Sequence, residues 1–288
     1  MRPSVYFDGS FVEVADARVG VFDGGWLHGA GLFETMRAQR GRVFRLNDHV
    51  DRLRRSAAEL LRPIEPDSLP DEAVFAELLE RNLLRDARVR MTVTAGSMHA
   101  PDNAGGAQLT VCVTASALDA YPAELYERGV QVAACDYRAS PTDPISRHKT
   151  TAYLPRLLGL RQARLKRCME ALWFTTENLL AEGCISNVFI VKSGALATPP
   201  LDGPILPGIT RGVILELARS ARVETRESSL TVDDLLDADE VFLTNSIMQV
   251  LPVIRVEKHD IGPGTVGPVT KQLLQEYRSR VEVECERA

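Results

Sequence analysis

The chain has 288 residues, of which 45% are apolar and 25% charged, a composition typical of a soluble globular protein. This length exceeds the size at which a single hydrophobic core stops growing, so we expect two packed lobes. Asp and Glu total 39 against 34 Lys and Arg, and the net charge of -5 argues against nucleic acid or an anionic membrane as a partner. A bound anion would therefore have to be held by cationic side chains or hydrogen-bond donors close to it.

The chain has no apolar run approaching the roughly 18 residues that a membrane span requires, and its first residues lack the apolar core of a signal peptide. The five cysteines are scattered and lack CxxC spacing, which favours reduced thiols over disulfides or a zinc site. The five histidines are equally dispersed. We therefore expect a cytoplasmic protein without a bound metal.

The first part of the chain predicts strands and turns, followed by helices. FDGSF indicates a hairpin turn at 7–11, and amphipathic helices are expected over 46–61, capped by an Asn or Asp, and over 71–84, with Leu83 on the inner face. Alternating strands are predicted at 88–95 and 108–114. The polar segment between them, GSMHAPDNAGGA, is long enough to be a functional loop.

The pattern loosens around residues 117–126, which we interpret as an interdomain linker. A smaller N-terminal α/β domain is then expected over 1–116 and a larger C-terminal domain over 127–288. The second domain begins with the alternating strand VQVAACDYR and continues with a long helix, short strands and a helix after LPGIT. Mixed strands with helices outside them predict an α+β or mixed α/β fold.

Two charged residues stand out as candidates for chemistry. Lys149 lies between a turn-like segment and a helix, beside Arg147 and His148. A lysine that forms a Schiff base must lose its proton near neutral pH, which requires a low dielectric or adjacent positive charge. The alternative is a solvated lysine. Glu182 enters an apolar strand, so it is either a surface turn charge or the partner of a protonated ring nitrogen.

Phosphate-binding groups are predicted in two segments and one helix. ILPGITRGVILELA places Ile209 and Thr210 in the first turn of an amphipathic helix, where backbone N–H groups and the helix dipole attract anions. The Thr-Asn-Ser sequence at 244–246 follows a strand and either donates to the same anion or caps an ordinary turn. Arg52 is the best guanidinium for a bidentate phosphate contact, the alternative being a solvated or salt-bridged arginine.

Five motifs occur in an order that resembles one family: DGGWLHGAGLFETMR, HVDRLRRSA, HKTTAYLPRLLGLRQA, AEGCISNVFIVKSGALATPPLDGPILPGITR and DEVFLTNSIMQVLPV. They are similar to the signatures of the class IV aminotransferases, the fold-type IV pyridoxal-phosphate enzymes. The resemblance covers roughly residues 5–280. It implies a two-domain fold like that of D-amino acid aminotransferase, pyridoxal 5'-phosphate as cofactor, a small-molecule amino acid or aminodeoxychorismate substrate, and a homodimer.

The resemblance also implies roles for individual residues. It makes Lys149 the Schiff-base lysine that removes the α proton, and Glu182 the partner of the pyridine nitrogen. The expected phosphate-binding positions are Arg52, Ile209, Thr210, Asn245 and Ser246. Tyr153, four residues after the lysine, is expected to reach the cofactor or its surroundings. The candidates for substrate binding are His28, Phe33, His99, Arg138 and Ile247.

The motifs bear unequally on the subfamily. Thr-Asn-Ser at 244–246 and GAGLFETMR both resemble aminodeoxychorismate lyases, whereas GPVTKQL near the C-terminus is shared with aminotransferases. The segment AGSMHAPDNAGG lacks the arginine with which D-amino acid aminotransferases bind the substrate carboxylate, and Ala95 stands where many lyases have an arginine. The carboxylate receptor is therefore sought among Arg138, Arg147 and His28, by their position near the motifs.

On balance the resemblance favours a 4-amino-4-deoxychorismate lyase, which forms 4-aminobenzoate and pyruvate for folate synthesis. The alternative is an aminotransferase acting on branched-chain L-amino acids or D-amino acids, with a 2-oxo acid as acceptor. A catalytically silent binding protein on the same fold is a third possibility. The presence of both Lys149 and Glu182 argues against it.

Overall fold

The computed structural model describes residues 3–99 and 108–286. The chain divides into two compact units. Unit 1 comprises Met1–Asp119, His148–Ala152 and Val281–Ala288, and unit 2 comprises Ala120–Arg147 and Tyr153–Arg280. Asp119 and Ala120 lie within the linker expected over 117–126. The return of the Lys149 segment to unit 1 has no signal in the sequence.

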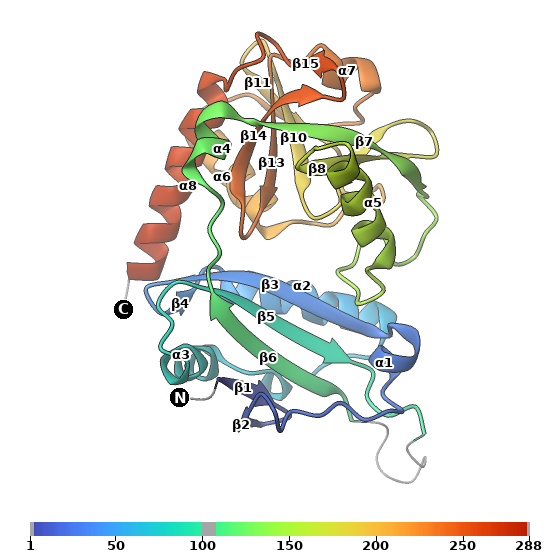
Figure 1. Cartoon of the computed structure of the whole chain (residues 1–288), viewed down its shortest axis with the longest axis vertical. Helices are drawn as coiled ribbons and strands as arrows, with labels where there is room; N and C mark the ends of the chain where they lie inside the picture. Colours follow the sequence, from blue (N-terminus) through green and yellow to red (C-terminus); the bar gives the residue numbers. More distant parts are fainter. Residues whose placement is uncertain (1–2, 100–107, 287–288) are drawn as a thin grey trace. The chain divides into compact units, whose positions relative to one another are not determined.

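Unit 1 is built on a six-stranded sheet in the order β2-β1-β6-β5-β3-β4, drawn in Figure 1 with helices beside it. Its strands are β1 (Ser4–Phe7), β2 (Ser10–Glu13), β3 (Gly31–Gln39), β4 (Arg42–Val43), β5 (Ala87–Thr94) and β6 (Thr110–Ala117). Its helical elements are α1 (Gly24–His28), α2 (Leu46–Leu60), the 3-10 turn η1 (Pro66–Ser68) and α3 (Glu72–Arg81). The hairpin predicted at 7–11 is present, because Asp8 and Gly9 both adopt the left-handed conformation that a tight turn requires.

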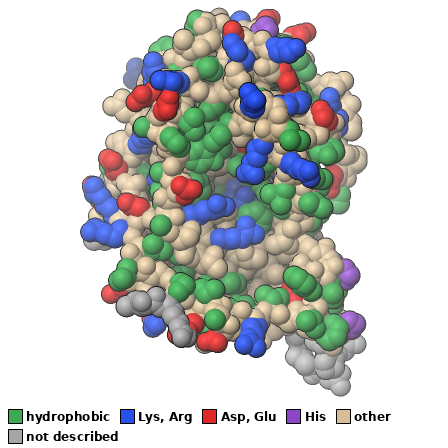
Figure 2. Space-filling model, in the orientation of Figure 1, with side chains coloured by type: hydrophobic (Ala, Val, Ile, Leu, Met, Phe, Trp, Pro, Cys, Tyr) green, Lys and Arg blue, Asp and Glu red, His purple; other side chains and the backbone are tan. Residues whose placement is uncertain are grey.

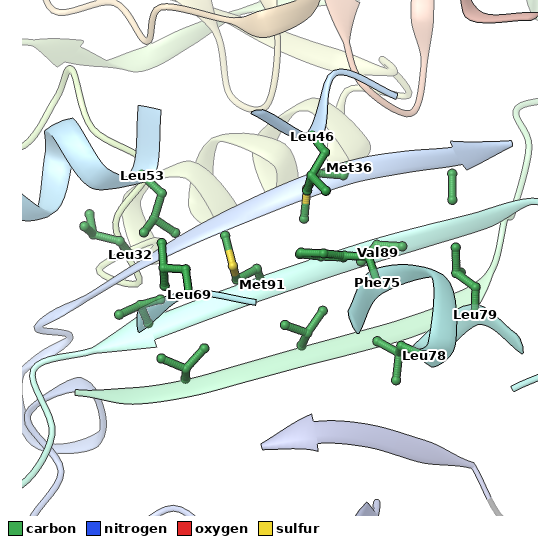
Figure 3. Packing of buried hydrophobic residues seen from close by; sticks show 14 of the residues in the cluster. Leu32, Met36, Leu46, Leu53, Leu69, Phe75, Leu78, Leu79, Val89 and Met91 are labelled. Atoms are coloured by element: carbon green, nitrogen blue, oxygen red, sulfur yellow. The ribbon is translucent and has the colours of Figure 1, made fainter. Parts of the chain in front are cut away.

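The core of unit 1 lies between one face of this sheet and the helices α2 and α3. Every second side chain of a strand points to that face of the sheet. The apolar residues of each helix recur with the helical period and form a stripe that packs against the same face. Figure 3 shows the packed side chains, which include Leu32, Met36, Leu53, Leu69, Phe75, Leu78, Leu79, Val89 and Met91. Burial of each such side chain contributes roughly 1.5–3 kcal/mol. The opposite face of β3 and β5 carries Phe33 together with polar residues such as Thr35, Arg90 and Thr92.

Two details of the helices differ from the prediction. Helix α2 begins at Leu46 with Arg45 as its N-cap, at φ 54° and without a side-chain capping bond, so the expected Asn or Asp cap is wrong. Helix α3 ends at Arg81, and Leu83 lies beyond that end with φ 55° and 76% exposure. Leu83 is therefore not on the inner face, because the helical periodicity used to place it no longer applies there.

Unit 2 contains a nine-stranded mixed sheet in the order β12-β11-β10-β13-β14-β7-β8-β9, with β15 paired to β14. The strands are β7 (Val130–Ala139), β8 (Glu170–Thr175), β9 (Leu180–Gly183), β10 (Asn187–Lys192), β11 (Ala195–Thr198), β12 (Thr225–Glu227), β13 (Glu240–Asn245), β14 (Gln249–Val256) and β15 (His259–Asp260). Strand β7 is parallel to both of its neighbours, β14 and β8, whereas β13 is antiparallel to both of its neighbours, β10 and β14. The sheet is therefore mixed, and the predicted mixed α/β class is confirmed.

The remaining helices are α4 (Ala123–Arg128), α5 (Leu154–Leu165), α6 (Ile209–Ser220), α7 (Val232–Leu236) and α8 (Pro268–Glu286). Helices α5 and α6 correspond to the predicted long helix and to the predicted helix after LPGIT, whereas α4, α7 and α8 were not predicted. None of the helices in the described ranges has the length and apolar character needed to cross a membrane. Figure 2 shows Lys, Arg, Asp and Glu side chains on the surface of the structure.

Candidate active site

Lys149 is positioned by backbone pairing with β3. Its carbonyl accepts a hydrogen bond from Phe33 N at 2.8 Å, and Thr151 N donates to Gly31 O at 2.8 Å, so this short segment extends the edge of the sheet. The pairing holds the half-buried side chain against an aromatic ring, with Lys149 Nζ 4.5 Å from the Phe33 ring centroid. The lysine is therefore a fixed group and not a solvated surface residue.

A second cation lies against the same ring. The guanidinium carbon of Arg90 is 3.7 Å from the Phe33 ring centroid, and Arg90 Nε donates to Thr92 Oγ1 at 3.1 Å. Strand alternation places Arg90 on the face of β5 opposite the apolar core. No motif in the sequence indicates a role for Arg90. Its relation to Phe33 follows only from the strand register, in which Phe33 pairs with Thr92 and Thr35 with Arg90.

A buried ion-pair cluster lies on the other face of β3. The carboxylate of Glu34 accepts from Arg52 Nε at 2.8 Å and from Arg52 Nη2 at 2.5 Å, and it contacts His49 Nδ1 at 2.7 Å. Burial alone would raise the pKa of Glu34, but the charge of Arg52 and the hydrogen bonds from His49 and Arg52 outweigh it and lower that pKa to about 2. Glu34 is therefore an anion at neutral pH and fixes the orientation of the Arg52 guanidinium.

His49 is the neutral member of this cluster. Burial is the largest cause that lowers its pKa, the charges of Arg52 and Lys149 lower it further, and Glu34 only partly offsets them. Because Glu34 is ionised, His49 Nδ1 carries the ring proton and donates a hydrogen bond to the carboxylate. The two hydrogen bonds from Arg52 engage two of its five N–H groups. The role of Arg52 as a phosphate ligand stays a prediction.

In unit 2, Glu182 is a buried, paired carboxylate with only 4% of its surface exposed. Its Oε1 accepts from Arg156 Nη2 at 2.5 Å. Its Oε2 accepts from Leu206 N at 3.0 Å and from Asn187 Nδ2 at 3.3 Å. Glu182 is thus not a surface turn charge.

Arg156 was also missed by the sequence analysis. It lies in the first turn of α5, donates through Nη1 to Gly183 O at 3.0 Å, and has its guanidinium carbon 5.0 Å from the Trp173 ring centroid. Burial would lower the pKa of Arg156, but the charge of Glu182 and its hydrogen bond raise it. No sequence signal separates Arg156 from Arg161 and Arg164 on the same helix, which are exposed.

Tyr153 lies at the N-cap of the same helix. Its hydroxyl donates to Cys184 O at 3.2 Å, two residues after Glu182 in the chain. Burial raises the pKa of Tyr153 well above its ordinary value, so the phenol is neutral near pH 7. The phenol is thus placed in the surroundings of Glu182 and Arg156, whose charges both act on it. Direct contact with a cofactor stays a prediction.

The start of α6 is shaped like an anion site. None of the described side chains caps this helix at Gly208, and a Cβ on Gly208 would lie 1.9 Å from Asn187 Oδ1, so only glycine permits the approach. Asn187 in turn pairs with Thr244 across β10 and β13. Thr210 is 3% exposed and Thr244 1%, and Thr244 Oγ1 has no hydrogen-bond partner among the described residues. A buried hydroxyl requires a partner, and a phosphate oxygen is a suitable one.

The turn after β13 is held by Asn245. Its Oδ1 accepts from Ile247 N at 2.9 Å and Met248 N at 2.7 Å, and its Nδ2 donates to Ile185 O at 3.0 Å. The side chain of Asn245 therefore holds the turn, and any contact with an anion is expected through backbone N–H groups or through Ser246. The binding roles of Asn245, Ser246 and Ile247 stay predictions.

The remaining arginine and histidine candidates for substrate binding are exposed. Arg138 donates through Nη1 to Cys135 O at 2.7 Å, which restrains its guanidinium. Arg147 and His28 are exposed. The exposed ring of His99 packs edge-on against Phe22, with ring centroids 4.8 Å apart. The rest of the predicted functional loop, residues 100–107, lies outside the described residues. Among the residues described, no group of three or more His, Cys, Asp or Glu is arranged to hold a metal ion.

These donors match the three parts of pyridoxal phosphate. A backbone-anchored lysine amine suits the aldehyde, a buried carboxylate suits the ring nitrogen, and an uncapped helix start beside buried hydroxyls suits the phosphate. The class that this fold and these groups define is a pyridoxal-phosphate-dependent enzyme. Residues 31–256 match the model of the family described as amino-transferase class IV. The chain belongs to this family.

Relatives of two activities cover nearly the whole chain. A Methanocaldococcus jannaschii protein, provisionally named a branched-chain-amino-acid aminotransferase, is 36% identical over 279 residues, which is 95% of each chain. The aminodeoxychorismate lyase of Bacillus subtilis is 30% identical and covers 96% of this chain and 94% of its own. Among solved structures, the Thermoproteus uzoniensis branched-chain aminotransferase with norvaline superimposes with a TM-score of 0.88 at 30% identity, over 99% and 96% of the two chains.

These comparisons confirm the predicted family, the fold-type IV architecture and the enzymatic character. Pyridoxal phosphate as cofactor is confirmed as well, because a further solved branched-chain aminotransferase of the same fold contains pyridoxamine 5'-phosphate. The comparisons do not single out the lyase that the motifs favour. Branched-chain aminotransferases match at least as well as the lyase.

Proposed function

We propose that this enzyme transfers the amino group of branched-chain L-amino acids to a 2-oxo acid. The pair of cations against Phe33 carries the proposal, because the Lys149 amine and the Arg90 guanidinium both lie against one ring. An amino acid offers a Cα proton to the amine, and its carboxylate suits the planar fork of the guanidinium. The higher identity to a branched-chain aminotransferase relative than to the lyase favours transfer over elimination.

Each group of the chain then has a defined task. Pyridoxal phosphate, when bound, supplies an electron sink for the charge left when Cα loses its proton. Lys149 Nζ anchors the cofactor, takes the proton from the substrate Cα and returns a proton at the end of the transfer. Glu182 accepts a hydrogen bond from the pyridine nitrogen. Thr210, Thr244 and the N–H groups at the start of α6 bind the phosphate, and Arg90 orients the substrate by its carboxylate.

Replacing Arg90 with alanine tests the carboxylate role. We expect KM for 2-oxoglutarate to rise about 10- to 100-fold, because loss of one charge-assisted hydrogen-bonding group costs about 1.5–3 kcal/mol. Initial-rate kinetics with L-leucine as donor measures this. Arg88→Ala, an exposed arginine on the same strand, serves as the control and is expected to leave KM within about twofold. An unchanged KM in Arg90→Ala would exclude this arginine as the receptor.

A second candidate function is the lyase. The Thr-Asn-Ser turn favours it, and the hydrogen bonds from Asn245 give that turn a defined shape. One assay separates the two activities, with glutamate formation from L-leucine, L-valine or D-alanine and 2-oxoglutarate compared with pyruvate release from aminodeoxychorismate. We expect transfer from the branched-chain L-amino acids. Pyruvate release without any transfer would instead assign the lyase.

We also propose that the enzyme is a homodimer. Large apolar side chains are exposed in one short stretch of unit 1, including Val21 at 69%, Phe22 at 53% and Trp26 at 75%. An exposed apolar cluster of this kind is typical of a protein interface.

Trp26→Asp should shift the mass measured by light scattering from that of a dimer toward that of a monomer, because a buried charge without a partner opposes association. Leu83→Asp, at a site that is 76% exposed, is the matched control and should leave the mass unchanged. A monomeric wild-type protein would contradict the proposed dimer, and a dimeric Trp26→Asp variant would place the interface elsewhere.

A further inference from the structure

Glu182 has a cationic partner that the proposed mechanism has not used. Arg156 reaches its Oε1 at 2.5 Å, and the two side chains are only 17% and 5% exposed. The guanidinium is held on two further sides, by the carbonyl of Gly183 at 3.0 Å and by the ring of Trp173. A guanidinium held in this way has little freedom to leave the carboxylate. The ion pair is therefore a built feature of unit 2 and not a transient surface contact.

We propose that Arg156 is a positioning residue that acts through Glu182. It holds the carboxylate as an anion in one orientation, so that the proton shared by Glu182 and the pyridine nitrogen of the cofactor stays on the nitrogen. This inference rests on the proposed role of Glu182 at that nitrogen. It adds a specific cause for the protonated ring on which the electron sink depends.

A proton shift between the ring nitrogen and Glu182 would change the charge beside Arg156. If the proton moved from the ring nitrogen to Glu182, the carboxylate beside Arg156 would become neutral. The buried guanidinium would then lose its counter-charge, and an unpaired buried charge is strongly destabilising. Two further donors to Glu182, Leu206 N and Asn187 Nδ2, are neutral and impose no such cost. Arg156 thus favours the charge-separated arrangement over the neutral one.

Three titratable groups near the ion pair, Tyr153, Cys184 and Glu170, supply no positive charge. Tyr153 donates to Cys184 O, and burial raises the pKa of its phenol. A hydrogen bond with Cys135, together with burial, raises the pKa of the Cys184 thiol, so both groups are neutral near pH 7. Burial raises the pKa of Glu170, whose oxygens accept from Cys184 N at 3.0 Å and from Ser186 Oγ at 3.0 Å. The carboxylate of Glu170 therefore binds the loop that contains Cys184 and Ser186, whereas Arg156 is paired with Glu182.

The test measures the protonation of the ring directly. Each variant is loaded with pyridoxal phosphate labelled with ¹⁵N in the ring, and the ¹⁵N resonance of the bound cofactor is recorded across a range of pH. We expect a protonated ring near pH 7 in the wild type and in Arg156→Lys. We expect Arg156→Met to move the resonance toward the unprotonated position. Arg161→Met, an exposed arginine on the same helix, is the matched control and should resemble the wild type.

A second measurement requires no cofactor. In cofactor-free Arg156→Met, the buried carboxylate of Glu182 loses the charge and hydrogen bond of Arg156 and takes up a proton more readily. The folded variant then binds more protons than its unfolded chain, so its free energy of unfolding should fall as pH rises from 5 to 8, relative to the wild type. Parallel pH profiles for the two proteins would contradict the inference.

The possible results distinguish a failure of the Arg156 role from a failure of the proposed Glu182 role. A wild-type ¹⁵N resonance in Arg156→Met, combined with a shifted one in Glu182→Gln, overturns the role of Arg156 and leaves that of Glu182 intact. An unshifted resonance in Glu182→Gln overturns the proposed role of Glu182 itself, and the inference with it. If Arg156→Met fails to fold, Arg156→Gln replaces it in both measurements.

Discussion

Lys149→Ala should reduce amino transfer about 10³-fold or more, since a general base alone contributes 10²- to 10⁴-fold and this lysine also anchors the cofactor. The lysine is held by the β3 edge and lies against the Phe33 ring, so no other amine is expected to take its place. Steady-state kinetics with L-leucine and 2-oxoglutarate measures the loss. In the wild type, borohydride should fix the cofactor covalently, and peptide mass mapping should locate it on Lys149.

The exposed Lys258 offers the matched control. Lys258→Ala should retain wild-type turnover and the wild-type labelling pattern, because a solvated lysine away from motif residues contributes little. Turnover in Lys149→Ala within tenfold of the wild type would contradict the assignment. Labelling of another lysine in the wild-type enzyme would contradict it as well.

The second large effect is expected on stability. Glu34→Gln should lower the free energy of unfolding of the cofactor-free protein by about 3–5 kcal/mol at pH 7, the cost of breaking a buried ion pair. The variant leaves the Arg52 guanidinium buried without its anion and removes an acceptor from His49. The lowered pKa of Glu34, about 2 against an ordinary 4.5, gives an independent figure of about 3 kcal/mol.

This contribution has a defined pH dependence. The folded-state pKa of Glu34 lies below the unfolded value, so the stabilisation is fully present above pH 4.5 and is lost as pH falls toward 2. The difference between wild type and Glu34→Gln should therefore shrink over that interval. Denaturant titrations at a series of pH values measure it. Glu77→Gln, which removes an exposed ion pair on α3, is the control and should cost less than about 1 kcal/mol. A gap of constant size at every pH would show that the ionisation of Glu34 is not its source.

Much of the fold could be predicted because its determinants are local. The hairpin at Asp8–Gly9 follows from turn chemistry, and helix α6 follows from the periodic apolar residues after LPGIT. The predictions failed where a local signal competes with tertiary packing. The N-cap of α2 is Arg45 and not an Asn or Asp, and Leu83 lies beyond the end of α3.

The sequence by itself determined the family, the cofactor, and Lys149 and Glu182 as its candidate anchors, because these depend on motifs that are contiguous in the chain. Only the tertiary structure decided which side chains lie against those groups. Arg90 reaches the ring of Phe33 through strand register, and Arg156 reaches Glu182 across 26 residues of sequence. Register and packing depend on the whole unit, so no local pattern distinguishes these two arginines from their solvent-exposed neighbours.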